Sequence, residues 1–461
     1  MQFIRDASSR QFLTGIHNRN HTFGNRLEYQ HKLSPASSWI SVLSHNLIAN
    51  RQQLGIDSDS TLSYWNVSSL FQKYNTFSKE LNFNTHLTLN TPKVKYLLGA
   101  GLQDTRARLE SDVLELRNEL ELNRTFYLFN ANTDIELNKR MRLSWRNKLS
   151  GTAHEYNAES RNLLFYEPGV SLSYYAGPAF RLSLSANRKN QLPAIENLTE
   201  HPLVTDYRTL IYNKSLLPFK STVSNTYSLN VTSFGVQKEQ FMSAGISYST
   251  HLNTVFKTNT LIRETSVTRY VYAPRENTLQ LNGFYDKKLY SVPIYFKGNV
   301  FFTYTTGTGF AGETETAFTR TFTNSKLSAG TRFKKRVLQV HGEFDLQRSQ
   351  FTQEVNRLNS GMGRYISSLR LSGTNGPLVY ALKLSQYLQT TRIGNNRIHM
   401  LSPEIRWVPG KSKTEYGIRG HNVLNLTGNK IYTAAYSGIS SDESEIAILD
   451  GYLLAGVKFK F

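Results

Sequence analysis

Apolar and polar residues alternate one by one along most of this chain, which is the pattern of a β-strand with one face in an apolar environment. Between residues 127 and 137 the odd positions are mostly apolar and the even positions are mostly polar. Asn138, Lys139 and Arg140 then turn the chain, and residues 141–149 repeat the alternation on a return strand. One face of this hairpin therefore suits lipid, and the other suits water.

The strands predicted in this way are joined by connections of two kinds. Tight turns are expected near residues 138, 177, 238, 287, 335, 375 and 411. Longer and more polar links are expected at 151–162, 191–221, 306–323, 349–362 and 426–446. Outer-membrane barrels have short periplasmic turns and long extracellular loops, so we assign the tight turns to the periplasm and the long links to the cell surface.

The pattern predicts an all-β fold, a large antiparallel transmembrane β-barrel with about 19 strands in this chain. The predicted strands start near residues 22, 36, 79, 93, 125, 141, 163, 179, 222, 241, 277, 291, 324, 337, 364, 378, 397, 414 and 447. Residues 1–21 are then an extracellular loop or a truncated start, and residues 22–461 are the barrel domain.

An odd number of strands is unusual, because single-chain bacterial barrels have even numbers and keep both chain ends in the periplasm. Three further strands would complete a barrel of about 22, so we expect the chain to be part of such a barrel. The alternative is a barrel of about 19 strands that one parallel pair closes, as in mitochondrial channels. Met1–Asn20 has no apolar core of a signal peptide, which favours a mature form, a fragment or a misplaced start.

Composition supports this fold class. Hydrophobic residues make up 39% of the 461 residues, yet aromatic residues reach 12%, with 26 Tyr and 26 Phe. No window approaches the 18 consecutive apolar residues of a membrane helix, which excludes a helical membrane protein. Barrel strands escape such a search and enrich aromatics at the membrane interfaces. Cysteine is absent, which excludes disulfides and thiolate metal sites.

The net charge of +20 raises the question of an anionic partner. Basic residues stand singly on alternating strands and in short turns such as 334–336, not in a long basic arm. Nucleic acid is therefore not expected, and anionic lipid or cargo fits better. Basic residues on polar faces are expected to give the lumen a positive field: Arg142, Arg146, Arg181 and Arg370. The alternative is that they only keep water in the barrel.

Two sequence motifs suggest ligand chemistry but lack the required context. Gly307–Gly312 fits G-x-G-x-x-G, but no helix or βαβ pattern follows, so a flexible loop is the better interpretation. His17 and His21 have helical spacing for a metal, but Gly15 and the neighbouring asparagines disfavour a helix. Neither a cofactor nor a metal is expected.

A third pattern places His341, Glu343 and Asp345 on one face of a predicted strand. Such residues suit acid and base chemistry, but no nucleophile or oxyanion donor is readable beside them. A solvated lumen wall explains them without catalysis. The chain is therefore not expected to be an enzyme, although an outer-membrane barrel enzyme stays as a distant alternative.

The last strand, residues 452–461, alternates and ends on an aromatic residue. Gly456, Phe459 and Phe461 resemble the assembly signal of outer-membrane barrels, whereas Leu454 stands where that signal usually has a polar residue. The alternative is an ordinary closing strand. The resemblance implies recognition by the barrel-assembly machinery and insertion into outer-membrane lipid.

Two further segments resemble TonB-dependent receptors, particularly the carboxypeptidase-regulatory-like or SusC-like group. Residues 167–174 and 185–193 are similar to that group's paired strands and its R-x-x-x-x-P segment before a long extracellular loop. Residues 420–425 are similar to its penultimate N-L-L-N segment. No segment resembles a plug or a TonB box.

This resemblance implies a receptor or transporter barrel in the outer membrane, for uptake or binding of an unidentified nutrient. In the intact protein the partners would be the TonB energy-transducing system, acting through a plug region, and a surface lipoprotein. A plug-free passive porin is the alternative function.

Overall fold

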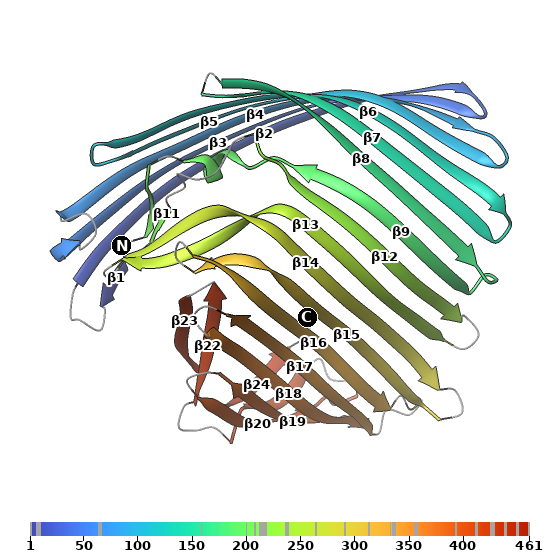
Figure 1. Cartoon of the computed structure of the whole chain (residues 1–461). Coiled ribbons are helices and arrows are strands. Elements are labelled where there is room, and N and C mark those ends of the chain that lie inside the picture. Colours follow the sequence, from blue (N-terminus) through green and yellow to red (C-terminus); the bar gives the residue numbers. More distant parts are fainter. Residues whose placement is uncertain are drawn as a thin grey trace.

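The computed structural model is dominated by one curved sheet, antiparallel except for one short parallel pairing, with short elements on its concave side (Figure 1). It describes residues 2–459 apart from 6–10, 63–66, 158, 200, 207–208, 212–218, 236–238, 263–264, 290–291, 312–313, 332, 334–337, 355–357, 392–393, 411–413, 425–428, 438–439 and 449–450. In this part of the chain no helix is long and apolar enough to cross a membrane.

In the described residues, nineteen long strands form one meander. They are β2 (Gln11–Ser34), β3 (Ser37–Leu62), β4 (Val67–Asn90), β5 (Val94–Val113), β6 (Leu116–Asn138), β7 (Met141–Tyr156), β8 (Glu159–Tyr175), β9 (Phe180–Gln191), β12 (Thr222–Gly235), β13 (Gln240–Ile262), β14 (Thr265–Leu289), β15 (Ile294–Ala311), β16 (Thr314–Thr331), β17 (Gln339–Gln353), β18 (Leu358–Asn375), β19 (Leu378–Thr390), β20 (Asn395–Trp407), β21 (Thr414–His421) and β24 (Tyr452–Phe459). The predicted all-β fold and its strand number are confirmed.

The remaining elements are short. They are β1 (Gln2–Arg5), the 3-10 helix η1 (Ile195–Leu198), β10 (Leu203–Asp206), β11 (Thr209–Ile211), and a separate hairpin of β22 (Asn429–Ser437) and β23 (Ser440–Ile448). Each long strand pairs with its neighbour in the chain, with β9 joined to β12 and β21 joined to β24. Among the described residues no pairing joins β24 to β1 or β2, so the sheet has two edges. Further strands that complete a barrel of about 22 stay a prediction.

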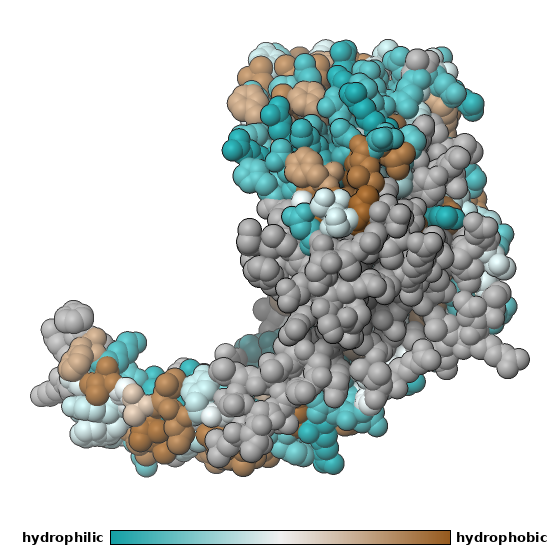
Figure 2. All heavy atoms as spheres, turned by 90° about the vertical axis from the view of Figure 1, so that its left-hand side faces the viewer, coloured by the Kyte–Doolittle hydropathy of each residue, from teal (hydrophilic) through white to brown (hydrophobic). Residues whose placement is uncertain are grey.

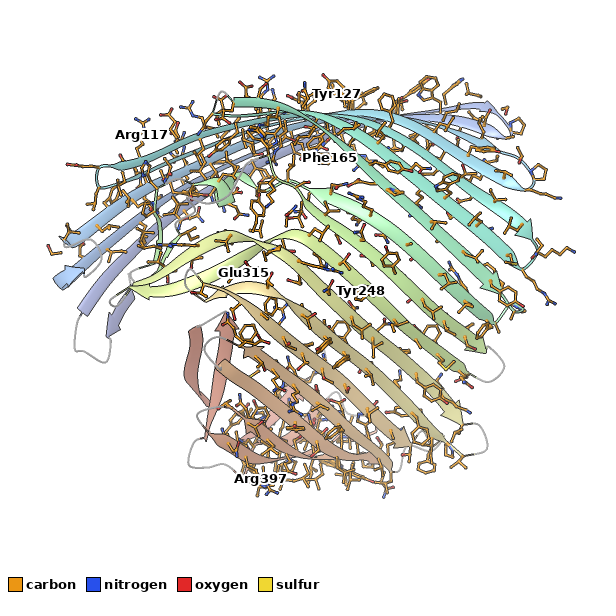
Figure 3. The ribbon with its side chains drawn as sticks, viewed as in Figure 1. Arg117, Tyr127, Phe165, Tyr248, Glu315 and Arg397 are labelled. Atoms are coloured by element: carbon orange, nitrogen blue, oxygen red, sulfur yellow. The ribbon has the colours of Figure 1, made fainter. Side chains whose placement is uncertain are left out.

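The two faces of the sheet differ in polarity. Leu43, Phe83, Leu102 and Tyr127 are aligned across four neighbouring strands and so share one face. Tyr127 lies on the convex side and Phe165 on the concave side (Figure 3). The convex face carries a belt of exposed apolar side chains, including Trp39, Leu98, Phe129, Trp145 and Leu149. This is the exterior of a membrane barrel, because only lipid accommodates so many exposed large apolar residues.

Strand starts agree with the predictions more closely at one rim than at the other. At the turn rim, which holds the turns at 91–93, 139–140 and 376–377, β7 and β19 begin at the predicted residues. At the opposite rim, which we call the strap rim, β4 begins at Val67 instead of 79, and β2 begins inside the range 1–21. The links 151–162 and 306–323 are therefore mostly strand, because the hairpins continue beyond the apolar belt.

Gly376 occupies the tight turn between β18 and β19 with a φ of 55°, and open space surrounds its missing Cβ. Because an L side chain strains this conformation, Gly376→Ala should lower the free energy of unfolding by about 1 kcal/mol. Urea unfolding of the refolded protein measures the change. Gly151→Ala is the control, since Gly151 also has open space but no left-handed backbone. Equal losses for both variants would contradict the turn-strain explanation.

Candidate functional site inside the sheet

The link between β9 and β12 spans residues 192–221, and its described residues lie along the concave face of the sheet (Figure 1). We call these described residues, 192–199, 201–206, 209–211 and 219–221, the strap. The prediction of an exposed surface loop is wrong for its described part, because Ile195, Leu198, Val204 and Leu210 are all buried. Apolar side chains at these positions need cover from water, and the inner wall of the sheet provides it.

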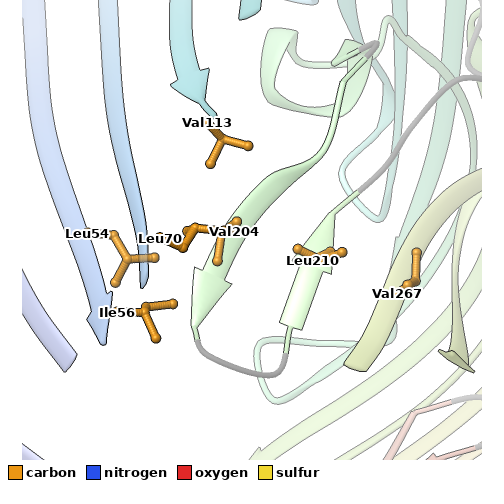
Figure 4. Packing of buried hydrophobic residues seen from close by; sticks show 7 residues of the cluster. All are labelled: Leu54, Ile56, Leu70, Val113, Val204, Leu210 and Val267. Atoms are coloured by element: carbon orange, nitrogen blue, oxygen red, sulfur yellow. The ribbon is translucent and has the colours of Figure 1, made fainter. Parts of the chain in front are cut away.

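A first apolar cluster joins the strap to two separate parts of the wall (Figure 4). Its buried members are Leu54, Ile56, Leu70, Val113, Val204, Leu210 and Val267. They come from β3, β4 and β5 on one side, from β10 and β11 in the strap, and from β14 on the other side. β11 also pairs in parallel with β14, which aligns Leu210 with Val267. The strap therefore bridges wall segments that are distant in the sheet.

A second cluster covers η1. Ile195 and Leu198 pack against buried side chains of β5, β6 and β7: Ala107, Leu109, Leu120, Leu122 and Tyr156. The Tyr156 hydroxyl donates a hydrogen bond of 2.9 Å to the backbone carbonyl of Leu198. Apolar burial and this hydrogen bond together fix the start of the strap.

Two wall amides hold the strap backbone in the same way. The Gln72 side chain donates to the carbonyl oxygen of Val204 and accepts from its N–H, both at 2.8 Å. The Asn118 side chain donates to the carbonyl of His201 at 3.1 Å and accepts from its N–H at 2.8 Å. Gln72 and Asn118 are almost fully buried. Truncating either would leave buried backbone groups unsatisfied, at a cost of about 1–3 kcal/mol.

Cations and aromatic rings hold both ends of the strap. The Arg124 guanidinium donates to the carbonyl of Pro193 at 2.6 Å. The Tyr272 hydroxyl donates to the carbonyl of Lys220 at 3.1 Å, while the Lys220 ammonium lies 4.8 Å from the centre of the Tyr272 ring. Burial lowers the pKa of Arg124 to about 10 and raises the pKa of Tyr272 to about 12. Arg124 stays charged and Tyr272 stays neutral at physiological pH.

His154 lies beneath the strap, with its ring 4.9 Å from the ring of Phe219. Arg161 covers Phe219 at 4.8 Å, and Arg124 is aligned with His154 on the next strand. The imidazole is 1% exposed, and among the described residues neither ring nitrogen has a hydrogen-bond partner. Burial, followed by the charge of Arg124, lowers the pKa of His154 to about 4.

We expect strap docking to depend on pH through His154. The undocked imidazole titrates near 6.5 and the docked one near 4, so the undocked form binds more protons between these values. Docking is therefore at full strength above about pH 6.5 and weakens as pH falls toward about 4. Labelling of a Val204→Cys variant from pH 8 to pH 4 with a dithiodipyridine, which reacts with thiols in acid as well, measures this, because undocking exposes the thiol. The dependence should disappear in His154→Leu, and its persistence there would assign it to other groups.

The apolar face changes sides along the strands that meet the strap. On β5, Leu98 and Leu102 face outward within the belt, whereas Leu109 and Val113 face inward beneath the strap. The outer positions next to these inward residues are charged, and Arg108 forms ion pairs with Glu110 at 2.9 Å and Glu119 at 2.8 Å. Figure 2 shows hydrophilic residues gathered at this end of the upper wall. The belt thus ends below the strap, which lies outside the membrane-spanning segments.

The predicted basic lumen residues all lie on the concave, polar face but do not form one site. Arg142 is aligned with Ser173, whose hydroxyl accepts from Arg181 at 3.1 Å. Arg146 is on the same face of β7, whereas Arg370 is on the distant β18, aligned with His341. A net positive lumen field stays a prediction.

The face of β17 that carries His341, Glu343 and Asp345 is part of a network within the wall. Tyr295 and His341 share a hydrogen bond of 2.8 Å, and Lys326 forms an ion pair of 2.9 Å with Glu343. No nucleophile is placed beside them by these contacts. The contacts fit the structural interpretation of this face.

The remaining predicted motifs lie on strands. His17 and His21 are on β2, where a spacing of four residues separates them by about 13 Å. Residues 307–311 belong to β15 and continue into the hairpin with β16, while Gly312 lies outside the described residues. In the described part of the chain no group of three His, Cys, Asp or Glu residues is placed to hold a metal.

The residues of the assembly signal fall on the last strand. Gly456 and Phe459 are on β24, aligned with Gly417 and Thr414 of β21. Phe459 is 62% exposed, and Phe461 lies outside the described residues. Recognition of these residues by the barrel-assembly machinery stays a prediction.

Comparison with known proteins adds only a likeness of fold. No family model matches the chain, and no curated protein matches it. Solved structures that match include "Copper transporter OprC" (TM-score 0.39, 8% identity, 98% of this chain and 80% of that chain). Others are the FrpB iron transporter from Neisseria meningitidis (0.36, 10%, 96% and 81%) and the siderophore receptor PirA from Pseudomonas aeruginosa (0.42, 10%, 92% and 72%). Identities and TM-scores this low carry no argument, so function must be argued from the chain's own residues.

Proposed function

We propose that this chain forms the wall of an outer-membrane receptor or transporter that takes up a solute from outside the cell. The observation that carries the proposal is the two-faced meander, with a belt of exposed apolar residues on its convex face and polar residues opposite. Only a sheet that surrounds an aqueous lumen within lipid stabilises both faces. The two edges must be paired in the membrane, because unpaired backbone groups in hydrocarbon cost several kcal/mol each.

The finer proposal is a TonB-dependent receptor of the carboxypeptidase-regulatory-like group, with the TonB system, the barrel-assembly machinery and a surface lipoprotein as partners. The segments at 167–193 and 420–425 support it, together with the residues Gly456 and Phe459 on β24. The transported nutrient is not specified by these residues.

Cell fractionation tests the coarser proposal. The chain, expressed behind a secretion signal in a Gram-negative host, should be recovered in the outer membrane as a heat-modifiable β-sheet protein. Recovery as a folded protein in the periplasm would overturn it. Energy coupling is tested in the intact protein: nutrient-limited growth that disappears without TonB supports the receptor, whereas energy-independent permeation favours the passive porin.

A further inference from the structure

The strap crosses the inside of the sheet as a chord. It is attached to β3–β7 through Gln72, Asn118 and the two apolar clusters, and to β14 through β11. Seven strands of the wall lie between β4 and β14: β5, β6, β7, β8, β9, β12 and β13. The chord therefore encloses the sector of the mouth that these strands surround, and separates it from the rest.

The wall of this sector below the strap is polar and uncharged along one continuous row. The row runs through five neighbouring strands by register: Ser144, Ser171, Ser185, Ser228 and Ser247. The hydroxyls of Ser185 and Ser228 are 2.6 Å apart. Because the wall carries small polar side chains at this level, the strap, and not the wall beneath it, limits passage through the sector.

We propose that the strap is a built-in constriction that sets the largest solute able to enter the β5–β14 sector, and that Gln72 and Asn118 are the positioning residues that keep it there. The inference rests on the proposed channel function. It does not require a separate plug, because residues of the wall's own connection supply the obstruction. Its position is held by paired hydrogen bonds to the strap backbone and by the two apolar clusters.

The test compares two double variants in the full chain. Gln72→Ala with Asn118→Ala removes both amide contacts to the strap. The matched control, Asn82→Ala with Gln103→Ala, removes a Gln and an Asn of β4 and β5 that both bind Glu80 within the wall. Swelling of liposomes in neutral sugars of increasing size measures permeation. The first variant should admit the largest excluded sugar at least roughly tenfold faster than wild type, and the control should not.

A reversible disulfide between the strap and β14 tests whether the position of the strap sets the size limit. The chain has no cysteine, so Leu210→Cys with Val267→Cys forms a single pair, at aligned positions of adjacent strands that suit a disulfide. In the Gln72→Ala, Asn118→Ala background, oxidation should restore the wild-type size limit, and reduction should release it. The proposal is overturned if the Gln72→Ala, Asn118→Ala variant keeps the wild-type size limit, or if oxidation of the cysteine pair does not change the size limit.

Labelling separates this proposal from the proposed function. Val204→Cys is introduced into three proteins: the otherwise wild-type chain, the Gln72→Ala, Asn118→Ala variant and the Asn82→Ala, Gln103→Ala control. A bulky maleimide should label the thiol only in the Gln72→Ala, Asn118→Ala variant, whether or not the protein conducts solutes. Labelling as expected without any permeation in any variant would refute the channel and leave strap positioning intact. Permeation with equal labelling in all variants would refute the role of Gln72 and Asn118.

Discussion

Leu98→Arg should destabilise the membrane-inserted protein by about 2–4 kcal/mol, because it places a charge near the middle of the lipid-facing belt. Leu98 is 47% exposed on the outward face of β5, aligned with Ala131 within the belt of β6. Burying the guanidinium in hydrocarbon costs far more than the lost apolar contact alone. Urea unfolding in phospholipid vesicles, followed by tryptophan fluorescence, measures the change.

Leu114→Arg is the matched control for this prediction. Leu114 is 45% exposed at the turn after β5, beyond the belt. The same substitution there meets water, so its effect should stay within about 0.5 kcal/mol. Similar losses at both positions would mean that the belt does not face lipid, and the outer-membrane function would have to be abandoned.

Leu109→Ala should lower the free energy of unfolding by about 2–5 kcal/mol, since it leaves a cavity between the wall and η1. Leu109 is fully buried in the cluster that holds Ile195 and Leu198. The same variant should increase maleimide labelling of a cysteine at position 204, because the strap loses part of its apolar support. Leu114→Ala is the control, with little change expected. A loss of stability without labelling would place the damage in the wall and not in the strap.

Sequence periodicity predicted the meander because each strand crosses the belt with one face toward lipid. There, apolar and polar residues must alternate, and the starts of β7, β19 and β21 at the turn rim were predicted to the residue. Above the belt both faces meet water or the strap, so this constraint disappears. The start of β14 at Thr265 was accordingly missed, with 277 predicted instead.

The sequence analysis did not identify the candidate site. Gln72 and Asn118 are ordinary wall amides in the sequence, and only the folded strap gives them a partner. The strap itself carried a readable signal, since apolar residues such as Ile195 and Leu210 stand in a supposed surface loop. A second signal was the change of apolar phase on β5, from even positions at Leu98 and Leu102 to odd positions at Leu109 and Val113.

The chord also dictates an order of events during assembly. Wall hairpins join residues that are close in the chain, whereas Gln72 binds Val204, 132 residues later, and the strap also requires β14. Local hairpins close sooner than such distant pairs, because loop-closure entropy rises with the length of chain between them. Strap docking is therefore among the last steps of assembly, because it requires β3 through β14 to have formed already. Until that moment Ile195, Leu198 and Leu210 are exposed to water, which makes the half-built wall the form most prone to aggregation and to proteolysis.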